Sequence, residues 1–479
     1  MVRFLSHRIS GRVIPLILMI MIISCNPHRV NTDVHPIVEG SDSYSLPAEG
    51  STLESRWWQA LNDPYLDAIV EQALSDNLTL KQARARIEQA IAADEQAASF
   101  LFPDLSGRAS EEKEWKGDES PEDTTIFGLA LSWEIDLWGR LSSARKASAY
   151  EILASREDLE AMAVLISSQV AETYYRVIEQ RLQLALLDRQ IKAGETLLEL
   201  TELRFGYGEA SVVDVFQQRQ QLASTRSRVP TVKSELRTLE NRLHVQLGRT
   251  PVRDAMKIAD DFPALPPLPL TGLPVDLLKN RPDLRRIFNE LVAIDYRVAE
   301  AVADRFPKIG LSGSASFTDG FSTEDRLLSL LLEAVAPLID WGRRGAEVEK
   351  RRARFREELA RYTHAYLIAI EEVENALWQE RHQLQFLSAL ENQITIARSN
   401  LAETRNRYRQ GLTDYLPVLT ALQSLQLLER EILSRQRELI SIRILLYRAL
   451  GGSRITDAQY QTAASGNTLE STLSEGVIK

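Results

Sequence analysis

The stretch that decides the fold runs from residue 127 to residue 140 and reads FGLALSWEIDLWGR. In its first part every second residue is apolar, namely Phe127, Leu129, Leu131, Trp133 and Ile135. A period of two over about ten residues is typical of a strand with an apolar and a polar face, as in strands that separate lipid from water. A soluble antiparallel sheet with one buried face would show the same alternation. We expect a strand pair over about 104–136.

A second copy of this pattern follows about 204 residues later. Phe102-Pro103 recurs as Phe306-Pro307, and Asp136-Leu137-Trp138-Gly139-Arg140 recurs, one residue shorter, as Asp340-Trp341-Gly342-Arg343. Arg204-Phe205-Gly206-Tyr207-Gly208 and Leu247-Gly248 recur as Arg407-Tyr408-Arg409-Gln410-Gly411 and Leu450-Gly451. Such a constant offset indicates a duplication. We predict repeats at 57–250 and 274–452, joined by a Pro-rich equatorial linker at 251–273.

The second repeat also predicts a strand pair, over about 308–339. Ile309, Leu311 and Phe317 alternate with small or polar residues. The segment from Leu327 to Leu332 is an almost continuous apolar run, so the sequence does not assign its residues to faces. Four strands cannot close around an open lumen, and open edges in lipid would leave backbone groups unsatisfied at several kcal/mol each. We therefore expect other copies of the chain to cover these edges, although the strand count does not fix their number.

Long helices are expected around each strand pair. Apolar residues step by three or four from Leu159 to Val177 and from Phe355 to Leu377, as on one face of an α-helix. Each repeat should contain a helix before the strands (about 64–100 and 274–305). A long helical hairpin should follow (142–248 and 344–450). A helix of about 64 residues is about 100 Å long, more than a compact domain needs. An isolated antiparallel coiled coil is the alternative.

The N-terminus has the features of an export signal with a lipid attachment site. Three arginines precede the apolar run 13–23, which is too short for a spanning helix. The run ends at Ser24-Cys25, which resembles the lipobox of bacterial lipoproteins. That resemblance implies a signal peptide at 1–24, a diacylglycerol and an N-acyl chain on Cys25, a lipidated tether at 25–56 and, through Asn26, the outer membrane. The alternative is an ordinary secretory signal with an incidental cysteine.

Composition argues against several other classes of protein. The net charge of −10 does not suit a nucleic-acid partner. The six histidines lack metal-ligand spacing, and neither a phosphate-binding loop nor a serine elbow motif occurs. With Cys25 lipidated, no thiol is left for catalysis. We therefore expect neither an enzyme nor a metal site, and no cofactor besides the lipid. A polar tail closes the chain at 453–479.

Together with Arg281-Pro282-Asp283-Leu284, these motifs resemble the TolC-like outer membrane factors. More narrowly, they resemble the lipidated NodT/OprM-type branch that serves RND pumps, over about residues 57–452. The resemblance implies a mainly α fold with a membrane β part. A homotrimer would close a 12-stranded β-barrel in the outer membrane and an α-helical barrel in the periplasm.

The function that this resemblance implies is passive export. The trimer would be the exit duct of a tripartite RND-type efflux system. Its partners would be a periplasmic adaptor (membrane fusion protein) and an inner-membrane RND pump. Two alternatives stay open: the duct of a type I secretion system, and a lipidated periplasmic coiled-coil adaptor.

The resemblance also places functional residues where the long helices turn. Gly206, Gly208 and Gly411 are expected at the periplasmic tips, where glycine permits the positive φ of a tight turn and the adaptor would dock. Asp214 and Tyr408 match a family pair that hydrogen-bonds between neighbouring helix pairs, and we expect this pair to hold the gate closed.

The rest of the expected gate departs from the family pattern. Pro417 and Thr420 replace aspartates that ring the lumen in the family, and Thr413 replaces a basic residue. The constriction of the periplasmic gate is therefore expected at Leu416 and Thr420.

Overall fold

The computed structural model describes residues 27–38, 43–46, 50, 56–114, 122–251, 256–318 and 326–452. The predicted signal peptide, its lipid attachment site Cys25 and the C-terminal tail lie outside the described residues, and they stay predictions.

The chain forms two compact units, and both repeats contribute to each. One unit comprises Met1–Val38, Ala85–Glu157 and Arg285–His364, and the other comprises Glu39–Arg84, Asp158–Leu284 and Ala365–Lys479. The units therefore do not follow the duplication. Corresponding segments of the two repeats pack together instead of folding as two separate domains.

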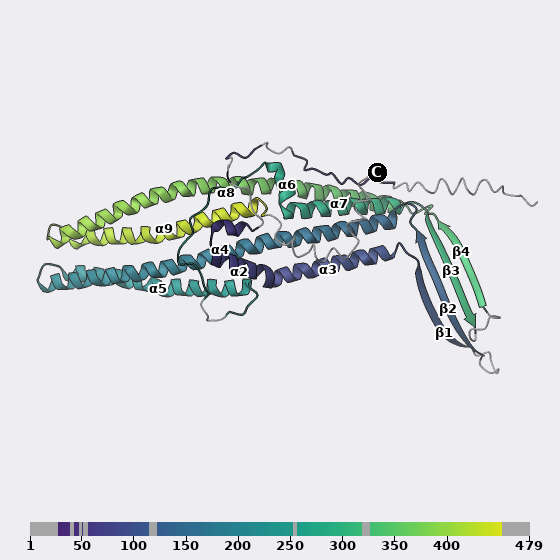
Figure 1. Cartoon of the computed structure of the whole chain (residues 1–479), viewed down its shortest axis with the longest axis horizontal. Helices are drawn as coiled ribbons and strands as arrows, with labels where there is room; N and C mark the ends of the chain where they lie inside the picture. Colours follow the sequence, from purple (N-terminus) through teal and green to yellow (C-terminus); the bar gives the residue numbers. More distant parts are fainter. Residues whose placement is uncertain are drawn as a thin grey trace, which may run out of the picture. The chain divides into compact units, whose positions relative to one another are not determined.

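The first unit contains a four-stranded antiparallel sheet with the order β1-β2-β3-β4 (Figure 1). Strand β1 covers Asp104–Glu114, β2 covers Glu122–Ile135, β3 covers Lys308–Thr318 and β4 covers Arg326–Val335. Both predicted strand pairs are confirmed. Within the described residues β1 and β4 are the edges of the sheet.

The register assigns a face to every strand residue, because opposite residues of an antiparallel pair point to the same side. Leu131 lies opposite Gly313, which lies opposite Leu330. The largely apolar face carries Leu105, Phe127, Leu129, Leu131, Trp133, Leu311, Phe317, Leu328, Leu330 and Leu332, with the charged Glu111 and Lys113 at the end of β1. The other face carries Ser106, Arg108, Ser132, Glu134, Ser312, Ser314, Ser316, Ser329 and Glu333. The pairing thus settles the faces of β4, with Leu327 and Leu331 on the polar side.

The helices before the strands are interrupted, so the prediction of single helices was wrong. In the first repeat, α2 (Pro64–Asp76) and α3 (Leu78–Ser99) are separated by Asn77. The Asn77 side chain accepts from the N–H of Thr79 at 2.8 Å and thereby caps the new helix. In the second repeat, η2 (Pro274–Asp276) and α6 (Leu277–Asn280) end before α7 (Pro282–Ala303), since proline disfavours helical geometry at the preceding residue.

The two predicted helical hairpins are confirmed (Figure 1). They comprise α4 (Arg140–Gly206) with α5 (Val212–Gln246), and α8 (Arg343–Arg409) with α9 (Tyr415–Ala449). The aspartate of the repeated Trp-Gly-Arg motif caps each long helix. Asp136 accepts from the N–H of Ser142 at 2.8 Å, and Asp340 accepts from the N–H of Arg344 at 3.3 Å. A carboxylate there also suits the positive end of the helix dipole.

The core of the second unit lies where η1 (Trp57–Leu61) meets the middle of α4. Trp57 is fully buried and donates its indole N–H to Ser167 at 3.1 Å. The Tyr174 hydroxyl donates to Asp63 at 2.8 Å, so this buried hydroxyl also has a hydrogen-bond partner. The Pro-rich linker is also fixed in this unit, because Arg443 donates to the carbonyl oxygens of Pro266 and Pro267 at 2.7 and 3.1 Å.

None of the described helices combines the length and the apolarity that a membrane crossing would require.

Candidate gate at the hairpin turns

Both hairpins turn through the same glycine-capped helix end. Gly208 has φ of 76° and Gly411 has φ of 73°, a left-handed conformation that costs a residue with a Cβ atom about 1–2 kcal/mol. The residue after each glycine donates its N–H to the carbonyl five residues earlier, from Glu209 to Arg204 and from Leu412 to Arg407, both at 2.9 Å. These two glycines thus hold the turns as predicted.

Gly206 does not have the predicted conformation. It is the last residue of α4 and is not among the residues with positive φ. The corresponding residue of the second repeat is Arg409, which ends α8. This position is helical in both repeats, and glycine is not required there.

The Asp214 side chain is hydrogen-bonded to the backbone at the start of its own helix, α5. It forms a capping box with Ser211, whose N–H donates to the Asp214 carboxylate at 2.9 Å. Tyr408 is buried, and its hydroxyl has no hydrogen-bond partner among the described residues. The expected hydrogen bond between Tyr408 and Asp214 is therefore not formed within the chain, because the Asp214 side chain satisfies backbone groups at the start of α5 instead.

Tyr408 is held by Arg204 instead. The guanidinium lies 4.6 Å from the Tyr408 ring centroid and donates to the carbonyl oxygens of Tyr408 and Arg409 at 2.9 and 3.2 Å. A cation at this position stabilises the C-terminal end of α8 and faces an aromatic ring. Burial raises the pKa of Tyr408, an effect that the nearby Arg204 opposes. Sequence reasoning missed Arg204, although it opens the repeated turn motif.

A second link joins the hairpins through Tyr415 and Gln218, both fully buried. The Tyr415 hydroxyl donates to the Gln218 side-chain oxygen, and the Gln218 amide donates to the Gly194 carbonyl at 2.7 Å. Burial raises the pKa of Tyr415, so this hydroxyl stays protonated as a donor. The Tyr415 ring packs edge-on against Tyr408 at 5.5 Å. Sequence reasoning missed this pair, because nothing local marks one glutamine among many on α5 as buried.

Leu416, Pro417 and Thr420 lie on the exposed face of α9. The Thr420 hydroxyl donates to the Leu416 carbonyl at 3.0 Å and so adds no link to another helix. The neighbouring Val418 and Leu419 point into the core. The exposed face is free to line a passage, and the role of these residues as a constriction stays a prediction.

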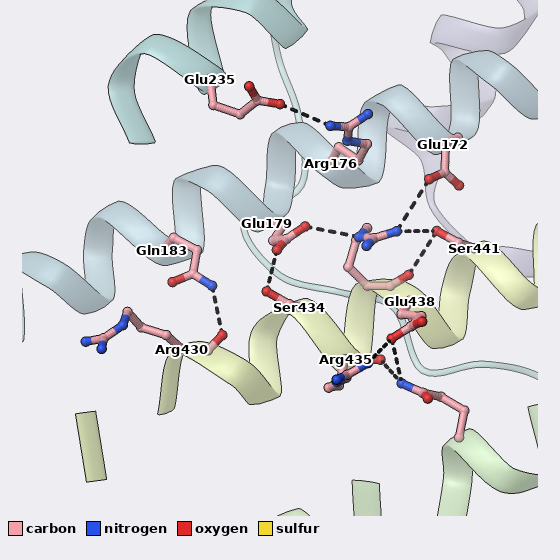
Figure 2. A network of polar contacts seen from close by, with 12 residues as sticks. Glu172, Arg176, Glu179, Gln183, Glu235, Arg430, Ser434, Arg435, Glu438 and Ser441 are labelled. Carbon is pink, nitrogen blue, oxygen red and sulfur yellow. Dashed lines mark hydrogen bonds and ion pairs between the residues drawn. The ribbon is translucent and has the colours of Figure 1, made fainter. Parts of the chain in front are cut away.

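Farther from the turns, polar side chains join α4 to α9 (Figure 2). Arg437 donates to Glu179 at 3.0 Å and to Glu172 at 3.4 Å. Ser434 donates to Glu179 at 2.8 Å, and Gln183 donates to the Arg430 carbonyl at 2.9 Å. An interface of this kind can exchange its hydrogen bonds with water, so separating it costs less than separating an apolar one.

No group of three or more His, Cys, Asp or Glu side chains that could hold a metal ion occurs within the part of the chain that the structure describes.

Comparison with known proteins identifies a family that shares this duplicated architecture. The sequence model of the outer membrane efflux protein family matches residues 69–249 and 273–452, one match for each repeat. Nodulation protein T of Rhizobium leguminosarum bv. trifolii is 28% identical over 423 residues, which cover 85% of this chain and 89% of that protein. The pyoverdine export outer membrane protein OpmQ of Pseudomonas putida is 29% identical over 426 residues, with the same two shares.

A solved structure agrees with this match. The outer-membrane channel OprN superposes with a TM-score of 0.82 at 28% identity, over 90% of this chain and 100% of that one. The family match covers well over half of the sequence, and the fold agrees along nearly the whole chain. The chain therefore belongs to the family of outer membrane efflux proteins.

Proposed function

We propose that three copies of this chain form the exit duct of a tripartite efflux system. Substrates would reach it from an RND-type inner-membrane pump through a periplasmic adaptor. The observation that carries the proposal is the sheet, which has one apolar face, one polar face and two open edges. An apolar face can contact lipid while the polar face lines water, provided that other copies pair with the edges. Three copies supply twelve strands, a number found among natural barrels.

The hairpin turns would dock the adaptor. Apolar side chains stand exposed around Gly206, Gly208 and Gly411, at Leu203, Phe205, Tyr207, Val212, Val213, Phe216 and Leu412. Exposed apolar patches of this kind are typical of protein-interaction sites. A partner with a complementary apolar hairpin end would remove these side chains from water, and this supports docking at the turns.

The gate would be held closed by two contacts between the hairpins. Arg204 holds Tyr408, and Tyr415 holds Gln218. Opening would separate the hairpins along the polar interface of α4 with α9, with Leu416 and Thr420 as the constriction. In this proposal Asp214 keeps α5 capped and is not the closing partner of Tyr408.

Cys25 would carry the lipid anchor. Replacing Cys25 distinguishes an integral channel from a lipid-anchored adaptor. Two or three acyl chains make an effectively permanent anchor. A Cys25→Ser variant that is still exported should nevertheless stay in the outer membrane and need detergent for extraction, because the sheet itself would be inserted. A coiled-coil adaptor that loses its lipid would be released in soluble form, which would contradict the proposal.

Two measurements test the duct directly. The purified protein in a planar bilayer should conduct ions as a stable oligomer. A strain that lacks its own outer-membrane duct should regain tolerance of small toxic compounds when it expresses this chain with a compatible adaptor and pump. Absence of conductance would refute the duct. Export of an unfolded polypeptide with a type I transporter, without rescue of compound efflux, would favour the secretion duct instead.

A further inference from the structure

Two aromatic side chains beside the sheet are exposed in a way that a single copy does not explain. Trp341 is 97% exposed and has φ of 54°, a left-handed conformation that is costly for a residue with a Cβ atom. Phe102 is 68% exposed. Both lie in the first unit, at the ends of the segments that lead into and out of the strands. A large exposed side chain on a strained backbone suggests a contact that forms only with a partner.

The chain itself contains the template for that contact. Trp138 stacks on Phe306 with a centroid distance of 4.9 Å and an angle of 27°. Its indole N–H donates to the Pro307 carbonyl at 2.8 Å. By the internal repeat, Trp138 corresponds to Trp341, and Phe306-Pro307 corresponds to Phe102-Pro103. The first repeat thus supplies the tryptophan and the second supplies Phe-Pro, while Trp341 and Phe102, which would form the reciprocal pair, stay largely exposed among the residues that the structure describes.

The sheet also contains one pairing between the repeats whose repeat equivalent is not formed within the described residues. Inside the chain β2 pairs with β3, and the repeat equivalents of these strands are β4 and β1, the two edges. Asp104 lies opposite Ser132 and Lys308 lies opposite Val335, so the repeat maps β1 onto β3 with an offset of 204 and β2 onto β4 with an offset of 203. The pair Leu131–Gly313 then corresponds to Ala334 on β4 and Ala109 on β1.

The faces of the strands agree with this register. Ala334 lies opposite Ile309, and Ala109 lies opposite Phe127, so both alanines are on the apolar face. A slip by one residue would pair Ala334 with Arg108 or Ser110, which point to the polar face.

The hairpin turns lie in the other unit and show the same pattern, in which one contact is formed and its repeat equivalent is missing from the described part of the chain. Arg204 lies over the Tyr408 ring inside the chain. Its repeat equivalent is Arg407, and the equivalent of Tyr408 is Phe205. Both are exposed. In each unit, therefore, a residue of the first repeat contacts a residue of the second, and the residues equivalent to this pair are exposed.

We infer that a second copy of this chain completes these contacts, with Trp341 stacked on Phe102 of the neighbouring copy and Ala334 of β4 opposite Ala109 of its β1. The Trp341 N–H donates to the neighbour's Pro103 carbonyl, and Arg407 covers the neighbour's Phe205. The contact is head-to-tail, the type that closes rings. The inference rests on the proposed oligomeric duct and names the residues and the register by which the copies meet.

Cysteine cross-linking in outer membranes tests the register. The full-length Ala109→Cys/Ala334→Cys variant should give reducible oligomers on a denaturing gel, because opposite Cβ atoms in a sheet lie about 4.5–5.5 Å apart. The Gly107→Cys/Ala334→Cys variant is the matched control, on the same face but about 7 Å along the strand. The Leu131→Cys/Gly313→Cys variant is a positive control, because these residues are opposite each other within one chain and should form an intramolecular disulfide. The single-cysteine variants show whether any cross-link involves Cys25.

A double-mutant cycle tests the aromatic contact without cysteines. Trp341→Ala and Phe102→Ala should each lower the temperature at which the detergent-solubilised oligomer dissociates. The double variant should fall no further than the worse single variant, because both remove one contact. If Trp341 sits in the lipid interface instead, the two losses add.

The outcomes separate the inference from the proposed function. Cross-linking at 109 with 334 together with non-additive losses supports the inference. A conducting oligomer that cross-links better at 107 with 334 overturns it and leaves the duct intact, as does one whose aromatic losses add. A wild-type protein that neither assembles nor conducts overturns both.

Discussion

Replacing Tyr415 with phenylalanine probes the gate most directly. The change deletes one oxygen atom and keeps the ring, so the packing of Tyr415 against Tyr408 is retained. What is lost is the hydrogen bond to Gln218, whose side chain is fully buried and otherwise bonded to Gly194. The Gln218 side-chain oxygen is left in the closed hairpin pair without a donor.

The size of the effect follows from this arrangement. A buried polar group that loses its partner costs about 1–3 kcal/mol. In the open state water can hydrate the same oxygen, so the penalty falls mainly on the closed state. The equilibrium should shift toward opening by roughly 5-fold to 150-fold per chain.

Single-channel recording in planar bilayers measures this shift as open probability. Tyr408→Phe is the matched control, because the Tyr408 hydroxyl has no hydrogen-bond partner among the described residues. Its removal should leave the open probability close to that of the wild type. Gln218→Leu, which removes the buried acceptor together with its need for a donor, should suppress part of the effect of Tyr415→Phe.

The opposite pattern would refute this reasoning. If Tyr408→Phe opens the channel and Tyr415→Phe does not, the closing partner of Tyr408 is a group outside its own chain, such as Asp214 of a neighbouring copy. The Tyr415–Gln218 contact would then be a packing feature of the hairpins.

Three further predictions concern stability. Arg443 and Glu380 are each 3% exposed and paired, so Arg443→Ala should destabilise the protein by about 3–5 kcal/mol in thermal or denaturant unfolding, and Arg443→Met with Glu380→Leu should recover most of the loss. Burial would raise the pKa of Asp283, but its hydrogen bonds with Arg281 hold that pKa below the ordinary value. The stabilisation from this pair should therefore be complete above about pH 4 and disappear as the pH falls further, and unfolding curves of Asp283→Asn should lack that decline. Gly208→Ala should cost about 1–2 kcal/mol in the same assay and Gly206→Ala should cost nothing, because only Gly208 has positive φ while both sites have room for a Cβ atom.

Much of the fold could be predicted because its signals are local and repeated. The change from a period of two to a period of 3.6 marks where strands give way to helices, and the chain shows this change twice. The helix break at Asn77 was not predicted, because it depends on a side chain that caps α3 and also donates to the distant Gln246 carbonyl at 2.8 Å. The faces of β4 also needed the partner strand, since an apolar run has no period of its own.

The candidate gate was less predictable than the fold. Gly208 and Gly411 follow from local backbone geometry, and their turns form as expected. Asp214 and Tyr408 were expected to meet, but Asp214 instead forms a local capping box with Ser211, three positions earlier in the chain. Tyr415 and Gln218 are 197 positions apart, and their contact depends on how two hairpins pack side by side.

The sequence by itself determined the duplication, the four strands, the two long hairpins and the glycine turns, because each depends on the periodicity or backbone preference of neighbouring residues. Only the tertiary structure decided which side chains meet between the repeats: Trp138 with Phe306, Arg204 with Tyr408, and Tyr415 with Gln218. Such contacts depend on the relative rotation and register of helices and strands far apart in the chain. That rotation and register are set by the packing of all the side chains between them, and no local pattern encodes it.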